Sequence, residues 1–187
     1  KQATKAAYER RIDELFAGGQ PALDGVRVLD RSDVLSLLGM GEGPVRLAEG
    51  KVIAGIDNHP RMTAKVWKQI PEWIENPAAV FESDTAEGLV FLAPETLGDA
   101  PVSIIVRPDG AQKGALQAHL LLNAYDRSAR TPFMRWIHEG LLKYADTKKF
   151  PALFQRTSGR QLPGTALRNR PGTERILTEN NLAAWRK

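Results

Sequence analysis

Three short apolar segments follow one another closely in the middle of the chain, at residues 79–81, 89–92 and 102–107. Each has the length and composition of a β-strand, and the third ends at the turn sequence Pro108-Asp109-Gly110. Parallel strands need a crossover of a dozen or more residues between them, and the intervals here are shorter. The sequence therefore favours neighbouring strands that pair antiparallel.

A fourth segment, residues 116–125, alternates imperfectly between polar and apolar side chains. If it is extended, one face carries His119, Leu121, Asn123 and Tyr125; a helix is the competing assignment, because Leu and Ala favour helices. Helical patterns come before and after this region. The order predicts an α+β fold, with N-terminal helices, then a mainly antiparallel four-stranded sheet, then a C-terminal helix and basic loops.

Helical spacing and capping residues predict the remaining elements. We expect helices at residues 3–17, from Ser32 to a stop at Gly39, from Thr63 to a break at Pro71 followed by a short helix before Pro77, at 131–144 and at 173–185. Residues 44–48 and 52–56 suggest a hairpin, and residues 145–172 lose periodicity and indicate a basic loop region. No internal repeat is visible.

The charge of the chain is uneven. Residues 1–126 carry 13 Lys and Arg against 18 Asp and Glu, whereas residues 127–187 carry 13 against 4, a net charge of +9. Such a basic segment indicates binding to an anion, either a phosphate backbone or an acidic protein. The alternative is a basic face that only contacts solvent, because it has the same composition. We divide the chain into a helical lead, residues 1–24, and an α+β domain, residues 25–187, that includes the basic region. Because the chain lacks an initiator Met, we expect a segment of a longer polypeptide.

The composition excludes several classes of protein. Cysteine is absent, which removes disulfides, thiol nucleophiles and thiolate zinc sites. There are three histidines, but no HExxH, no paired-Asp calcium loop, no GxxxxGK[ST] and no GxGxxG, so we expect neither a metal ion nor a cofactor. No apolar run approaches the ~18 residues that a membrane helix needs, so we expect no membrane span.

The reactive groups that remain are imidazoles, hydroxyls and cations. They suit the cleavage of RNA, in which the ribose 2′-hydroxyl is the nucleophile and the protein supplies a base, an acid and cations. His59 precedes the helix capped by Thr63 and is the first candidate for acid or base, although a lone histidine is often packed at a loop corner. His119 and Tyr125 join it as candidates if residues 116–125 are extended, and the alignment fails if they are helical. We interpret His138, inside a predicted helix, as a surface residue.

Cations in the second half of the chain, and one near His59, are candidates for binding the substrate phosphates. They are Lys65, Arg127, Arg130, Lys149 and Arg156. Arginine suits this role because its planar fork binds phosphate through two hydrogen bonds. The alternative is that these side chains serve only solubility.

Several short motifs together resemble the C-terminal domain of phage MuF-type proteins over roughly residues 25–165. They are His59-Pro60-Arg61-Met62-Thr63, Gln69-Ile70-Pro71, Asn76-Pro77, Val80-Phe81-Glu82-Ser83 and Asn123-Ala124-Tyr125, and later Trp136, Gly140-Leu141-Leu142-Lys143-Tyr144 and Leu162-Pro163. The resemblance implies the barnase, EndoU, colicin and RelE-like nuclease superfamily, to which the related phage polyvalent-protein domains belong. It implies His59 and Tyr125 as site positions. Where such domains tend to show Ser-x-Tyr, this chain has Asn123, which leaves no hydroxyl at that position.

The leading hypothesis is a metal-independent ribonuclease toxin or effector domain that acts on RNA in the cytoplasm of a target cell, delivered by secretion or by a phage particle. An acidic immunity protein is the expected protein partner. The alternatives are a non-catalytic module for nucleic-acid binding or virion assembly and, with less support, an ADP-ribosyltransferase that consumes NAD.

Overall fold

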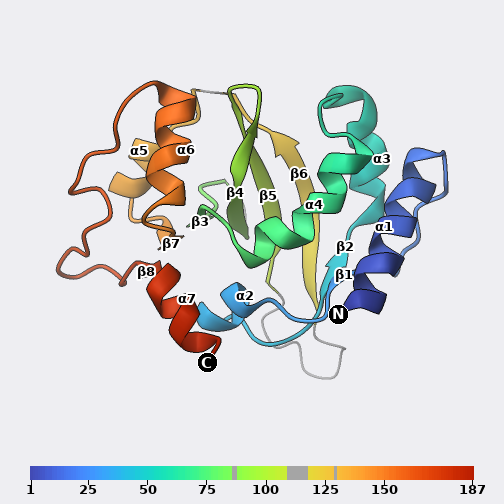
Figure 1. Ribbon diagram of the computed structural model, residues 1–187, viewed down its shortest axis with the longest axis horizontal. Coiled ribbons are helices and arrows are strands. Elements are labelled where there is room, and N and C mark those ends of the chain that lie inside the picture. Colours follow the sequence, from blue (N-terminus) through green and yellow to red (C-terminus); the bar gives the residue numbers. More distant parts are fainter. Residues whose placement is uncertain (86–87, 109–117, 129) are drawn as a thin grey trace.

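The computed structural model describes residues 1–85, 88–108, 118–128 and 130–187. These residues form one eight-stranded sheet with helices on both of its faces (Figure 1). The helices are α1 (Gln2–Phe16), α2 (Asp33–Leu37), α3 (Glu49–Asn58), α4 (Ala64–Glu75), α5 (Phe133–His138), α6 (Lys149–Ser158) and α7 (Glu179–Trp185). The strands are β1 (Arg27–Leu29), β2 (Val45–Leu47), β3 (Ala79–Glu82), β4 (Leu89–Leu97), β5 (Ala100–Arg107), β6 (His119–Asp126), β7 (Leu142–Ala145) and β8 (Leu177–Thr178).

The sheet is mixed, with strand order β1-β2-β6-β5-β4-β3-β7-β8. Strands β3, β4, β5 and β6 pair antiparallel in succession, and β7 pairs antiparallel with β3. However, β2 runs parallel to β6, and β8 runs parallel to β7. The predicted fold class, with a mainly antiparallel four-stranded sheet, is therefore wrong. Of the added strands, β2 is the first arm of the predicted hairpin. The others, β1, β7 and β8, have two to four residues each, too few to show the alternation that reveals a strand in a sequence.

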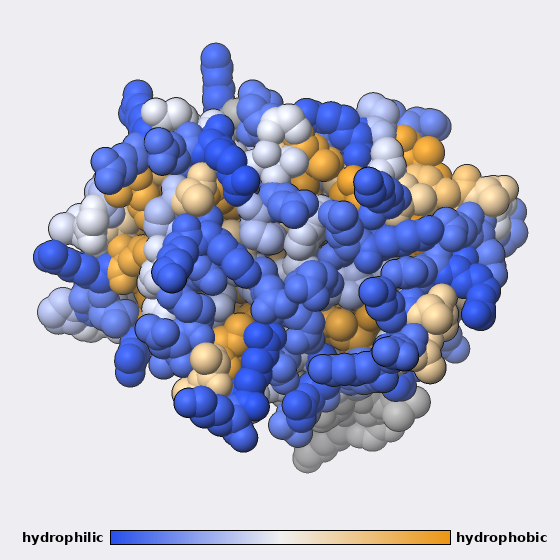
Figure 2. Space-filling model, viewed as in Figure 1, coloured by the Kyte–Doolittle hydropathy of each residue, from blue (hydrophilic) through white to orange (hydrophobic). Residues whose placement is uncertain are grey.

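Each face of the sheet has its own hydrophobic core. Phe91 of β4 packs into the core that α1, α3 and α4 cover, whereas its neighbours Val90 and Leu92 pack into the core that α5 and α6 cover. Because both faces are covered, the central strands are apolar on both sides. The outer surface seen in Figure 2 is mostly hydrophilic, with small separated hydrophobic patches. In the described parts of the chain, no helix is long and apolar enough to cross a membrane.

Local signals near the N-terminus are confirmed, but the predicted hairpin is wrong. Helix α1 ends at Phe16, and the Ser32 hydroxyl accepts the hydrogen bond from the Leu35 N–H at 3.1 Å that caps α2. In the hairpin region, only the first arm is a strand, and the second is helix α3. Glu49, at the start of this helix, is buried among partners supplied by other elements.

The carboxylate of Glu49 accepts hydrogen bonds from Arg11 of α1 and from two backbone N–H groups. Arg11 donates from Nε at 3.0 Å and from Nη2 at 2.7 Å, Ala22 at 3.0 Å and Val26 at 2.8 Å. Helix α1 also contributes Tyr8, Ile12 and Leu15 to the core that α4 covers. Residues 1–24 thus pack closely against the remainder of the domain.

The predicted helix break at Pro71 is also wrong, because α4 continues through this residue to Glu75. Proline lacks the N–H that would bond to the carbonyl four residues earlier, here that of Trp67. The hydroxyl of Tyr8 donates a 2.6 Å hydrogen bond to this carbonyl instead. The Tyr8 hydroxyl of α1 therefore supplies the hydrogen bond that Pro71 cannot donate to the Trp67 carbonyl, and the helix continues past the proline. The predicted cap is confirmed, since the Thr63 hydroxyl accepts from the Val66 N–H.

Three further elements differ from the prediction in the last third of the chain. The helix predicted up to residue 144 ends at His138; Gly140, with φ of 76°, reverses the chain, and strand β7 follows. The predicted loop contains helix α6, whose buried Phe150, Leu153 and Phe154 recur at helical spacing. The terminal helix, α7, begins at Glu179 rather than near residue 173. The predicted strand at 116–125 is confirmed from His119 onward; its first two residues, and most of the turn at Pro108-Asp109-Gly110, lie outside the described residues.

Candidate active site

His59 lies where α3 ends and the chain turns into α4. Its Nδ1 atom is 3.3 Å from Oδ1 of Asp126, the last residue of β6, and its ring stacks on that of Tyr125 with 5.5 Å between centroids. The His59 side chain is 35% exposed, so part of it is accessible to a ligand. The contact joins the two residues that the resemblance implies as site positions, and their role in a site stays a prediction.

Arg61 holds the carboxylate of Asp126 in place. Its Nε and Nη2 atoms lie 2.9 and 2.7 Å from Oδ2, and its Nη1 donates a 2.8 Å hydrogen bond to the carbonyl of Leu97. The other oxygen, Oδ1, is buried and accepts no well-formed hydrogen bond within the described parts of the chain; it faces His59. Asp126 is thus fixed on one side and directed at the imidazole on the other.

Arg127 contacts two aromatic rings, that of Tyr125 and that of Trp136 in α5. Its Cζ atom is 5.1 Å from the ring centroid of Tyr125 and 5.2 Å from that of Trp136, and its Nε donates a 2.5 Å hydrogen bond to the hydroxyl of the buried Ser103. Cation–π contacts of this kind hold a guanidinium in one orientation. Within the described residues, its two terminal nitrogens have no hydrogen-bond partner and can donate to a phosphate.

The four planar groups form one continuous arrangement, since His59 and Arg127 both lie against Tyr125 and Trp136 lies beyond Arg127. It brings together a titratable ring, a phenol and an oriented cation. Sequence reasoning missed Asp126 and Arg61. Asp126 follows Tyr125 directly and Arg61 is two residues from His59, but their contact depends on how α3 and β6 meet.

The family model of the phage MuF C-terminal domain matches residues 51–152, more than half of the chain. The chain belongs to this family. The match begins within α3 and ends within α6, and it includes His59, Arg61, Asp126 and Arg127. No curated protein and no solved structure matches the chain. These comparisons do not extend to the nuclease superfamily, which stays a prediction.

The MuF C-terminal domain does not bring His119 to this site. His119 is the first residue of β6, is only 2% exposed, and has its Nε2 atom 3.2 Å from the carbonyl of Gly41. Tyr125 is six residues further on, about 20 Å along a strand. In addition, a register shift opposite Ile105 and Val106 interrupts the alternation of β6, so that Leu121 and Ala124 enter the same core. The two residues therefore lie apart, although sequence reasoning grouped them.

The other predicted cations are distributed over the surface of the domain. Lys65 is exposed in the first turn of α4, and Arg130 is exposed after β6. Lys149 and Arg156 belong to α6, where Arg156 donates a hydrogen bond to the carbonyl of Pro94. Among these five candidates, Arg127 is the one that touches the ring of Tyr125.

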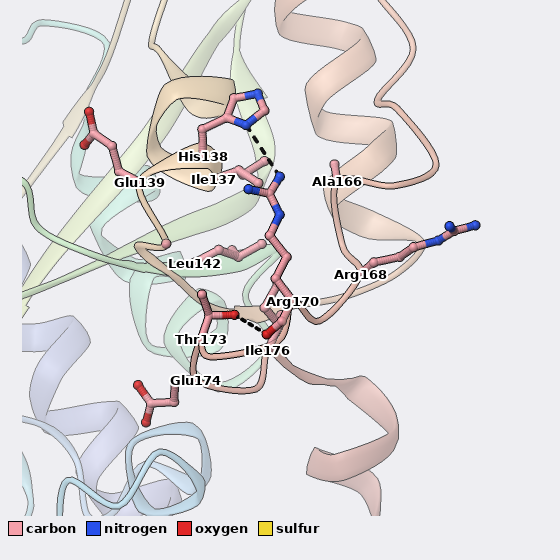
Figure 3. Close-up of a pocket in the computed structure, with 11 residues that line it drawn as sticks. Ile137, His138, Glu139, Leu142, Ala166, Arg168, Arg170, Thr173, Glu174 and Ile176 are labelled. Atoms are coloured by element: carbon pink, nitrogen blue, oxygen red, sulfur yellow. Dashed lines mark hydrogen bonds between the residues drawn. The ribbon is translucent and has the colours of Figure 1, made fainter.

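A pocket elsewhere in the MuF C-terminal domain lies between the turn after α5 and the loop that leads to β8 (Figure 3). In this pocket Arg170 points at His138 with 3.5 Å between Nη2 and Nδ1, while Arg168 points away. Glu139 and Glu174 also line it, and Glu174 pairs with Lys143. Both cations and carboxylates therefore line this pocket. Among the described residues, no three His, Asp or Glu side chains are grouped so as to hold a metal ion.

Proposed function

We propose that this MuF C-terminal domain is a metal-independent endoribonuclease with His59 as its general base. The observation that carries the proposal is the contact of His59 with Asp126 beside Tyr125 and Arg127. A carboxylate against Nδ1 favours the tautomer with its proton on Nδ1, and the lone pair is then on Nε2. Nε2 is the atom that can accept a proton from a bound substrate.

The reaction that fits these groups is attack of a ribose 2′-hydroxyl on the adjacent phosphorus. His59 Nε2 takes the 2′-hydroxyl proton as the new P–O bond forms, and the P–O bond to the 5′-oxygen breaks. The leaving oxygen needs a proton, and either the Tyr125 hydroxyl or the protonated His59 can supply it. Arg127 neutralises the charge that builds on the phosphate oxygens. The products are a 2′,3′-cyclic phosphate and a 5′-hydroxyl end.

The test measures cleavage of a 12-nucleotide RNA in the presence of EDTA, with mass spectrometry of the products. We expect cyclic-phosphate ends, no cleavage of an oligonucleotide with 2′-O-methyl groups throughout, and a loss of about 10²- to 10⁴-fold in His59→Ala. The matched control is His138→Ala, which removes a histidine from α5 and is expected to retain activity. Thermal unfolding of both variants verifies that they fold.

Three results would contradict the proposal. They are an inert parent protein, activity that disappears with EDTA and returns with a divalent ion, and a His59→Ala variant as active as the parent. RNA binding without any turnover would favour the second candidate, a nucleic-acid-binding or virion-assembly module, which the basic C-terminal third also supports.

Delivery and inhibition are part of the same proposal. A phage-associated ribonuclease acts on RNA in the cytoplasm of an infected or competing cell, and a secreted toxin would do the same. An acidic immunity protein would bind the exposed cations and so block access to the RNA. Growth arrest with fragmentation of total RNA after induced expression of the chain, absent in His59→Ala, is the expected result in cells.

A further inference from the structure

A basic surface separate from the His59 site lies along the outer face of α6. A groove between this helix and β4 is lined by Pro94, Lys148, Lys149, Ala152, Gln155 and Arg156. The opposite face of α6 packs into the core through Phe150, Leu153 and Phe154, and this packing orients the groove face of the helix outward. Ala152, with its small side chain, leaves space between the cations of the first and last turns.

The three cations of this groove have no carboxylate partner. No Asp or Glu oxygen lies within 4.0 Å of Lys148, Lys149 or Arg156 in the described parts of the chain, whereas Arg135, Lys143 and Arg186 of the same C-terminal third form ion pairs. The carboxylates closest to the start of α6 are occupied. Asp146 accepts the backbone N–H groups of Lys148 and Lys149, and Glu179 accepts hydrogen bonds from Thr147. Glu179 also acts on Lys148 through its charge, but none of the three cations forms an ion pair in the described parts of the chain, so their side chains can donate hydrogen bonds to an external anion.

The groove and the His59 site share one strand, β4. Arg156 donates to the carbonyl of Pro94, and Arg61 donates to that of Leu97, three residues further along. Three residues of a strand span about 10 Å. Figure 1 shows α6 and the connection from α3 to α4 at the same end of the sheet, on either side of the hairpin that joins β4 and β5. A polyanion that crosses this hairpin can contact both regions.

We propose that the α6 groove binds the phosphodiester backbone of the RNA a few nucleotides away from the bond that is cut. This inference rests on the proposed function, because that proposal names RNA as the substrate. It adds that the bound RNA extends from the His59 site to the α6 groove. Three unpaired cations along one helix face match a repeating chain of phosphates, and the absence of stacking aromatics in the lining indicates binding without base preference.

The experiment measures binding of a fluorescein-labelled 12-nucleotide single-stranded RNA by anisotropy, in the His59→Ala background so that no cleavage interferes. The groove variant carries Lys148→Gln, Lys149→Gln and Arg156→Gln. The control variant carries Lys5→Gln, Arg10→Gln and Lys51→Gln, three exposed cations of α1 and α3. Both variants lose the same charge, so a difference between them reports position rather than net charge.

We expect the groove variant to bind the RNA at least ~10-fold more weakly than the parent and to lower the slope of log K against log salt by ~2, because each single-strand phosphate contact contributes about 0.7. The control variant is expected to bind within about twofold of the parent. Equal losses in the two variants, or an unchanged groove variant, would overturn the inference. Tighter binding of poly-glutamate than of RNA through the same three residues would also overturn it, in favour of an acidic protein.

The result is separable from that of the cleavage test. If the protein binds RNA through the groove but never cleaves it, the ribonuclease proposal is overturned and the groove proposal stands. If the protein cleaves RNA but the groove variant binds RNA as tightly as the parent, the ribonuclease proposal stands and the groove proposal is overturned.

Discussion

The Nδ1 atom of His59 lies 3.3 Å from Oδ1 of Asp126, and this contact joins the end of α3 to the end of β6. Arg61 grips the other carboxylate oxygen, so the carboxylate has little freedom to turn away from the imidazole. On the proposed mechanism, Asp126 is a positioning residue, because it acts on the substrate only through His59.

Replacing Asp126 by Asn is expected to lower kcat by about 10²-fold, the order of a general acid–base contribution, with little change in KM. An amide can donate to Nδ1 and so stabilise the tautomer in which Nε2 carries the proton and cannot act as a base. Steady-state kinetics on the 12-nucleotide RNA measure both parameters. Asp30→Asn, at an exposed carboxylate paired with Arg27, serves as the control. An equal rise in KM with kcat intact would show that Asp126 contributes to binding instead.

Arg127→Lys tests whether the orientation of the guanidinium matters beyond its charge. Lysine keeps the positive charge but loses the fork, the contact with Ser103 and the stacking between Tyr125 and Trp136. We expect kcat/KM to fall by about tenfold, equivalent to ~1.4 kcal/mol. The same exchange at the exposed Arg10 is the control. Unchanged kinetics in Arg127→Lys would mean that only the charge is needed.

Glu49→Gln is expected to lower the free energy of unfolding by about 3 kcal/mol, because one oxygen of this buried carboxylate becomes an NH2 group, which cannot accept the hydrogen bonds from Arg11 or from the backbone. Urea denaturation at pH 7 measures this difference. Glu14, which is exposed and pairs with the same arginine, provides the control; Glu14→Gln should cost no more than about 0.5 kcal/mol.

The pH dependence of this difference gives a second measurement. Burial raises the pKa of the Glu49 carboxyl, but hydrogen bonds from Arg11, Ala22 and Val26 outweigh it, and the pKa is lowered below 4.5. A group whose pKa is lower in the folded state stabilises fully above its unfolded pKa, and the stabilisation disappears as the pH falls through the folded value. The gap between the parent and Glu49→Gln should therefore narrow below about pH 4.5. A gap that stays constant down to pH 3 would exclude ionisation of Glu49 as its cause.

The sequence by itself determined the features that depend on a few consecutive residues. Caps at Ser32 and Thr63, the strands from 79 onward and the extended segment that begins at His119 are set by local hydrogen bonds and by alternation. The resemblance to MuF-type domains also implied His59 and Tyr125 as site positions, and the structure brings their rings together.

Only the tertiary structure decided the features that need a distant partner. Helix α4 passes Pro71 because Tyr8 of α1 donates to the carbonyl of Trp67, and α3 forms where its buried Glu49 meets Arg11. Strand β7 exists because it pairs with β3. In the site, Asp126 and Arg61 act on His59 only once α3 and β6 have met. Except for His59 and Arg61, no short window of sequence contains both members of any of these pairs, and the free energy of each long-range contact appears only when the chain has closed the loop between its partners.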